Sequence, residues 1–195
     1  MIRGATSAAD VAPHRFARWV SAVGQPAVGI PLGCLLLGWT LADARWAVAT
    51  MLAASAPIIG VLLLRAIHVV ETLRITGRRR LLLLSGGAAW EVVAVTGLIL
   101  LGAPAPLRAA LVGLLGGVAA LILLHPTGVS AHTSVFALFA GTLIVGEPLL
   151  GTVVACAGAL AGWSRWRLGA HTLLQVLAWP PAIGAVALAL TLATP

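Results

Sequence analysis

PLRAALVGLLGGVAALILL, residues 106–124, contains a single charged side chain, Arg108, close to its start. A helix needs about twenty apolar residues to cross a hydrocarbon core of ~30 Å. Backbone polar groups in lipid must be paired within the segment, so this stretch predicts a membrane-spanning helix. Similar apolar segments recur along the chain, at residues 20–41, 46–66, 83–102, 130–147, 149–164 and 172–193.

The composition of the whole chain agrees with repeated membrane spans. Of its 195 residues, 61% are hydrophobic and 9% are charged, and the mean hydropathy is +1.07. Soluble domains carry about 25% charged residues, so their class is excluded. We predict an all-α polytopic membrane helical bundle of about six to seven transmembrane helices, forming a single domain over residues 1–195. Short connections around Asp43 and around residues 104–106 predict antiparallel helical hairpins.

The N-terminal residues carry charge and an aromatic anchor ahead of the first apolar run. We expect residues 1–19 to form an interfacial segment, because tryptophans such as Trp19 gather at membrane surfaces. The apolar run that follows is long and lacks a small-residue cleavage site. It therefore favours a retained first helix over a removed signal peptide.

The formal net charge is +7, and all twelve basic residues are arginine. The N-terminus defines side A of the predicted bundle. Side A receives ten arginines, whereas Arg45 and Arg108 fall on the opposite side. By the positive-inside rule, side A is predicted to be cytoplasmic. We expect no nucleic-acid partner, since the sequence shows neither a solvated basic face nor an aromatic platform. Cys34 and Cys156 lie in apolar runs without metal-ligand spacing and are interpreted as packing residues.

Two polar windows on side A have the residue types needed for phosphate chemistry. The first is Ser130-Ala131-His132-Thr133 at the start of a predicted helix, where free N–H groups and the helix dipole attract anions. The second is SRWRLGAH, residues 164–171, which brings an arginine and a histidine between two apolar runs. Arginine binds phosphate oxygens in a fork, and histidine can act as nucleophile or as acid and base.

These windows resemble the second and third signature motifs of the type 2 phosphatidic acid phosphatase superfamily. Its second motif reads Pro-Ser-Gly-His, and its third reads Ser-Arg, five residues, His, three residues and Asp. The chain matches these two motifs at five positions, and Gln175 stands in place of the Asp of the third motif. The matching residues are Ser130, His132, Ser164, Arg165 and His171. The run GWSRWRLGAHTLLQV also resembles a divergent actinobacterial branch in which Gln at this position is usual. The resemblance covers roughly residues 128–178.

The resemblance implies a role for each matching residue. His171 would attack phosphorus and form a phosphohistidine, and His132 would protonate the leaving alcohol. Arg165 and the helix start at Ser130 and Ala131 would hold the phosphate oxygens. Gln175, one helical turn after His171, would orient the histidine. The family uses no metal and no other cofactor.

The first motif of the family, a Lys, six residues and Arg-Pro, is not present as written. The nearest basic run is Arg78-Arg79-Arg80, and we interpret these arginines either as phosphate ligands or as a topogenic loop that contacts lipid phosphates. His14, His68 and His125 are interpreted as interfacial residues. Glu91 lies well inside a predicted span, and we expect it either to be functional or to pair with an arginine of this run.

The predicted function is hydrolysis of a phosphomonoester or diphosphate on a membrane lipid, with a polyprenyl or glycerolipid substrate, at the cytoplasmic face of the plasma membrane. A non-catalytic protein of the same fold that binds anionic lipid or acts as a scaffold is the alternative, because of Gln175 and the missing first motif. An intramembrane prenyltransferase is excluded, since only Asp10 and Asp43 are available for its Asp-rich sites. The sequence leaves a homo-oligomer open.

Overall fold

A computed structural model describes the backbone of residues 8–66 and 77–195. It describes side chains from residue 14 onward in the first range, except residues 64 and 65, and from residue 85 onward in the second. The structure is all-helical, and no described residue lies in a strand. The helices in chain order are α1 (Ala8–Val23), α2 (Pro26–Leu41), α3 (Ala44–Ala66), α4 (Gly77–Leu100), α5 (Ala105–Leu124), the 3-10 helix η1 (His125–Thr127), α6 (Ala131–Gly146), α7 (Pro148–Arg167), α8 (Leu173–Leu177) and α9 (Trp179–Ala193).

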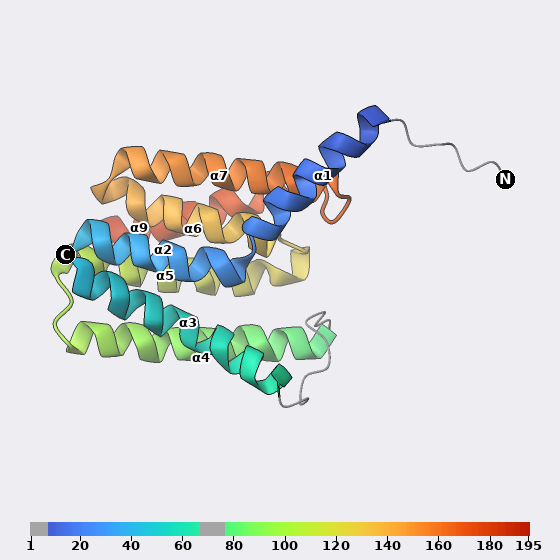
Figure 1. Cartoon of the computed structure of the whole chain (residues 1–195). Helices are drawn as coiled ribbons and strands as arrows, with labels where there is room; N and C mark the ends of the chain where they lie inside the picture. Colours follow the sequence, from blue (N-terminus) through green and yellow to red (C-terminus); the bar gives the residue numbers. More distant parts are fainter. Residues whose placement is uncertain (1–7, 67–76) are drawn as a thin grey trace.

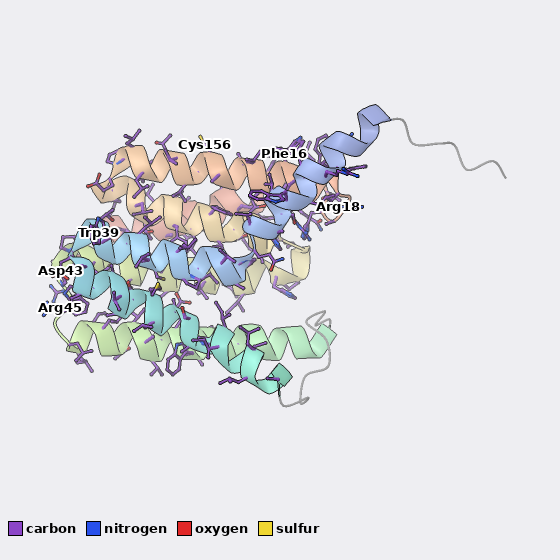
Figure 2. The ribbon with its side chains drawn as sticks, in the orientation of Figure 1. Phe16, Arg18, Trp39, Asp43, Arg45 and Cys156 are labelled. Carbon is purple, nitrogen blue, oxygen red and sulfur yellow. The ribbon has the colours of Figure 1, made fainter. Side chains whose placement is uncertain are left out.

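The long helices run back and forth between two ends of a bundle (Figure 1). Asp43 closes the connection between α2 and α3, where its Oδ1 accepts a hydrogen bond from the Trp46 backbone N–H at 3.1 Å. Helices α2 and α3 pack along each other, which confirms the hairpin predicted at this position. Asp43 and Arg45 lie at one end of the bundle and Arg18 at the other (Figure 2). Helix α6 begins and α7 ends at the Arg18 end, which we call the site end (Figure 1).

The first predicted span, residues 20–41, is not one continuous helix. Helix α1 ends at Val23 and α2 begins at Pro26, and the two axes differ by 53°. The break has a local cause, because a residue that precedes proline is sterically driven out of the helical region. Gln25 accordingly adopts an extended conformation, with φ −64° and ψ 140°. The last predicted span, 172–193, is likewise divided into α8 and α9, just before Pro180 and Pro181.

The number of helices that meet the length and apolarity expected of a membrane span is smaller than the sequence predicts. Among the described residues there are three such segments, Ala44–Leu63, Ala105–Thr127 and Leu173–Ala193, and four if the bent pair α1 and α2 is one span. The apolar helices Ser85–Leu100 and Ala131–Gly146 are shorter. These helices are consistent with a membrane protein, whereas the expected count of six to seven spans is not established by them.

Helix α6 lies at the centre of the bundle and contacts α2, α5, α7 and α9. Glycines permit these close crossings. A Cβ on Gly141 would collide with the backbone of Gly184 in α9, and a Cβ on Gly184 would lie 2.7 Å from the carbonyl oxygen of Ala137. Small residues at helix crossings are what membrane packing favours, because there van der Waals contact replaces the hydrophobic effect. The glycines therefore fix how closely α9 approaches α6.

Replacing Gly141 with Ala is expected to lower the free energy of unfolding by about 1–3 kcal/mol, because the added methyl group overpacks the crossing of α6 and α9. Thermal unfolding of the purified protein in detergent measures this loss. The matched control is Gly97→Ala in α4, where a Cβ meets no atom within 4 Å. Equal destabilisation by both substitutions would contradict the role assigned to the crossing.

Candidate functional site

Helix α7 ends in a hydrogen-bonded turn that reverses the chain at the site end. The Gly169 backbone N–H donates to the carbonyl oxygen of Trp166 at 2.9 Å, and the Ala170 N–H donates to that of Arg165 at 3.0 Å. This pair of bonds is the Schellman motif, which requires a left-handed residue after the helix. Gly169 supplies it with φ +66°. The motif places His171 just beyond the end of α7, six residues after Arg165.

A capping box follows His171 directly. Thr172 is the N-cap of α8, and its Oγ1 accepts a hydrogen bond from the Gln175 backbone N–H at 3.3 Å. In return the Gln175 Oε1 accepts from the Thr172 backbone N–H at 3.0 Å. Reciprocal bonds of this kind satisfy two free donors at a helix start. They hold the backbone immediately after His171 in one conformation.

The Gln175 side chain also ties this loop to the segment that leads into α6. Its Nε2 donates to the carbonyl oxygen of Thr127 in η1 at 3.2 Å. The next residue, Gly128, has φ +77°, and a Cβ there would collide with the Gln175 amide. Glycine is therefore required at residue 128 for two reasons, the backbone angle and the space. Gln175 thus bonds the backbone of the loop after His171 and the backbone of η1. Its orienting of the His171 ring, which the resemblance implies, stays a prediction.

Ser130 occupies the predicted N-cap position of α6, but its side chain does not cap the helix. The residue is fully buried and has φ −78° and ψ 109°, as an N-cap should, without a side-chain bond to a helix N–H. Its Oγ instead accepts from the Thr133 hydroxyl at 3.2 Å. The Ser130 side chain therefore does not bond any N–H group in the first turn of α6. These N–H groups, including that of Ala131, are the ones that the sequence assigns to an anion.

His132 lies in the first turn of α6, at the site end, within the electrostatic reach of Arg165 and His171. Burial, and after it the nearby positive charges of Arg165 and His171, together lower the pKa of His132 from 6.5 to about 4. Since α6, the end of α7 and the following loop meet here, residues 132, 165 and 171 gather at one place. His132 is consequently neutral at pH 7.

Arg165 connects this cluster to the N-terminal helix. Its Nη1 donates to the Ser21 Oγ of α1 at 3.0 Å, and Ser21 is itself buried. The Nε of Arg165 is also buried, and it has no hydrogen-bond partner among the described residues. A buried guanidinium N–H without an acceptor is costly. An anion oxygen from a ligand would supply that acceptor.

The structure thus brings together His132, Arg165 and His171, and places Ser130 and Ala131 at the same helix start. Residues 78–80 form part of the first turn of α4, but the side chains of Arg78, Arg79 and Arg80 lie outside the described residues, as does His68. Ser21 was missed by the sequence reasoning. No local pattern signals it, because its contact with Arg165 joins residues 144 positions apart.

No group of three or more His, Cys, Asp or Glu side chains within the described ranges is arranged to hold a metal ion. Comparison of the chain with protein-family models, with curated proteins and with solved structures finds no match.

Replacing Gln175 with Ala removes two side-chain hydrogen bonds, each worth about 1 kcal/mol. We expect the free energy of unfolding to fall by about 1–2 kcal/mol in thermal unfolding in detergent. Gln25→Ala is the matched control, because Gln25 makes no side-chain cap bond at the start of α2. An unchanged unfolding temperature for Gln175→Ala would refute the tether between the loop and η1.

NMR titration of the histidine side chains should show His132 with a midpoint near 4. In the variant Arg165→Gln the midpoint should rise, since loss of a positive charge favours protonation of the imidazole. Arg167→Gln, at an exposed neighbouring position, should leave it in place. A wild-type midpoint at the ordinary value of 6.5 would show that His132 is neither desolvated nor close to Arg165.

Proposed function

We propose that the chain is a metal-independent lipid-phosphate phosphatase similar to the type 2 phosphatidic acid phosphatase superfamily. The observation that carries this proposal is the meeting of His132, Arg165 and His171 at one end of the bundle, with the Arg165 Nε buried and lacking an acceptor. Two histidines and an arginine at one place supply a nucleophile, a general acid and a phosphate ligand, the groups that this proposal needs. The spacing of SRWRLGAH and its pairing with SAHT support the same chemistry.

The reaction proceeds in two displacements. An imidazole nitrogen of His171 attacks phosphorus, the P–O bond to the lipid breaks, and His132 gives a proton to the leaving alkoxide. Water then gives a proton to His132 as its oxygen attacks the phosphohistidine, the P–N bond breaks, and phosphate leaves with His171 and the protonated His132 restored. Arg165 and the first-turn N–H groups of α6 stabilise the negative charge on the phosphoryl oxygens in both transition states.

His132 has to carry a proton to act as the acid, although its pKa in the ligand-free protein is low. A bound phosphate group supplies two negative charges beside it, which oppose the positive charge of Arg165. The pKa of His132 therefore rises when substrate binds. Protonation of the acid is thus coupled to the presence of the phosphate that it serves.

The proposed substrate is a polyprenyl or glycerolipid phosphate whose tail stays in the bilayer while its phosphate meets the site end. In this proposal the helices α2, α3, α4, α5, α6 and α7, with α8 and α9 together, are seven spans, and the first turn of α6 with His132 lies at the membrane surface. The positive-inside rule then puts the site end at the cytoplasmic face of the plasma membrane.

Phosphate release from phosphatidic acid, phosphatidylglycerol phosphate and undecaprenyl phosphate in detergent micelles tests this function. We expect His171→Ala to lower kcat at least about a thousandfold, as loss of a nucleophile does. His132→Ala and Arg165→Ala should lower it about a hundredfold, the scale for a general acid or an oxyanion donor.

His14→Ala is the matched control, because His14 is an exposed histidine of α1 and should leave the rate unchanged. Trapping of a radioactive phosphohistidine in the wild type, and its loss in His171→Ala, identifies the nucleophile. Release that survives in His171→Ala would exclude this mechanism. Binding of the lipids to liposome-reconstituted protein with no release from any of them would favour the non-catalytic lipid-binding alternative.

A further inference from the structure

A second polar feature lies away from the site end, in the interior of the bundle. A cavity of about 220 Å³ lies between α2, α3, α4, α5 and α6. None of the proposed site residues lines it. Along α5 its wall extends from Leu111 to Leu121, ten residues that correspond to about 15 Å of helix. The cavity is therefore separate from the proposed phosphate site.

Glu91 of α4 is the one charged side chain among the described residues that line this cavity. No hydrogen bond or ion pair of Glu91 is found within the described part of the chain. The backbone of α4 separates Glu91 from the nearest arginine of the basic run, Arg80, by eleven residues, or about 16 Å along the axis. That separation is too long for the ion pair considered from the sequence. An ionised carboxylate in apolar surroundings without a partner is costly, and a cationic ligand would stabilise it.

The position of Glu91 within the cavity defines the shape of the ligand. On α4 the lining runs from Gly87 to Leu98, and Glu91 lies between apolar positions on both sides, such as Ala88 and Val95. A ligand with its charge at one end and a long chain behind it would leave part of this wall uncovered. A ligand whose charge is surrounded by apolar groups would contact the apolar wall of α4 on both sides of Glu91.

Two aromatic side chains, Trp90 and Phe139, line the same cavity. The Trp90 ring is held in place by a hydrogen bond from its Nε1 to the carbonyl oxygen of Ala53 at 2.8 Å. Aromatic rings attract quaternary ammonium groups that lie over the ring face. The aromatic rings and the carboxylate therefore favour the same ligand charge.

The volume limits the ligand size. A cavity of ~150 Å³ holds a benzene molecule, so 220 Å³ corresponds to about nine non-hydrogen atoms. We propose that this cavity binds a small lipophilic cation, a tertiary or quaternary ammonium with short apolar substituents, and that the Glu91 carboxylate is its counter-ion. A hydrocarbon chain of a lipid would also fill the space, but it would leave Glu91 unpaired.

Binding of tetraethylammonium to the purified protein in neutral detergent, measured by isothermal titration calorimetry, tests the proposal. Glu91→Gln should weaken binding by at least about tenfold, since the amide carries no charge. The matched control is Glu147→Gln, an exposed glutamate between α6 and α7 that does not line the cavity, and it should bind like the wild type.

A second variant and a second probe keep the test independent of how well Glu91→Gln folds. Ala94→Leu, which narrows the cavity and keeps the carboxylate, should also weaken binding. Tetraethylmethane, the uncharged isostere, should not displace tetraethylammonium from the wild type. Displacement by the isostere, or equal binding to the wild type and Glu91→Gln, would show that the cavity is an apolar-chain site and overturn the proposal. None of these outcomes depends on phosphatase activity.

Discussion

The close approach of neighbouring helices to α6 is the constraint on which the rest of the structure depends. Gly141 and Gly184 leave no room for a side chain where α6 crosses α9, and Gly158 and Gly162 of α7 lie against Phe136 and Thr133 of α6. Helix α6 is enclosed by α2, α5, α7 and α9. Its first turn therefore lies next to the ends of these neighbouring helices. The polar residues at those ends share one small volume as a result.

Side-chain hydrogen bonds connect the loops at the site end. Gln175 bonds the backbone at Thr172 and at Thr127, and Arg165 bonds Ser21 of the N-terminal helix. These bonds connect α1, η1, α7 and α8 across the entrance to α6. The sequence assigned residues 1–19 to an interfacial segment and Ser21 to the first apolar run. In the structure Ser21 belongs to α1, so this N-terminal helix is a direct neighbour of the arginine proposed to bind phosphate.

The molecule separates two kinds of polar chemistry along its length. At the site end, positive groups gather where helices start and stop, which suits an anion. In the interior, one carboxyl group and two aromatic rings face an apolar cavity, which suits a cation. Charges in the interior are weakly screened, which strengthens the preference of the cavity for a cation. The proposed phosphate and ammonium sites therefore do not compete for the same ligand.

The sequence by itself determined the helical class, the hairpin at Asp43 and the placing of SAHT and SRWRLGAH at one end, because apolar run length and local capping are encoded in contiguous residues. It also placed Ser130 at the start of α6. It did not foresee the bend before Pro26, since an apolar run continues on both sides of it. Only the tertiary structure decided the contact of Arg165 with Ser21, the two tethers made by Gln175 and the cavity around Glu91. Each of these depends on helices far apart in the chain meeting at a particular depth and angle, and no local pattern of residues records that meeting.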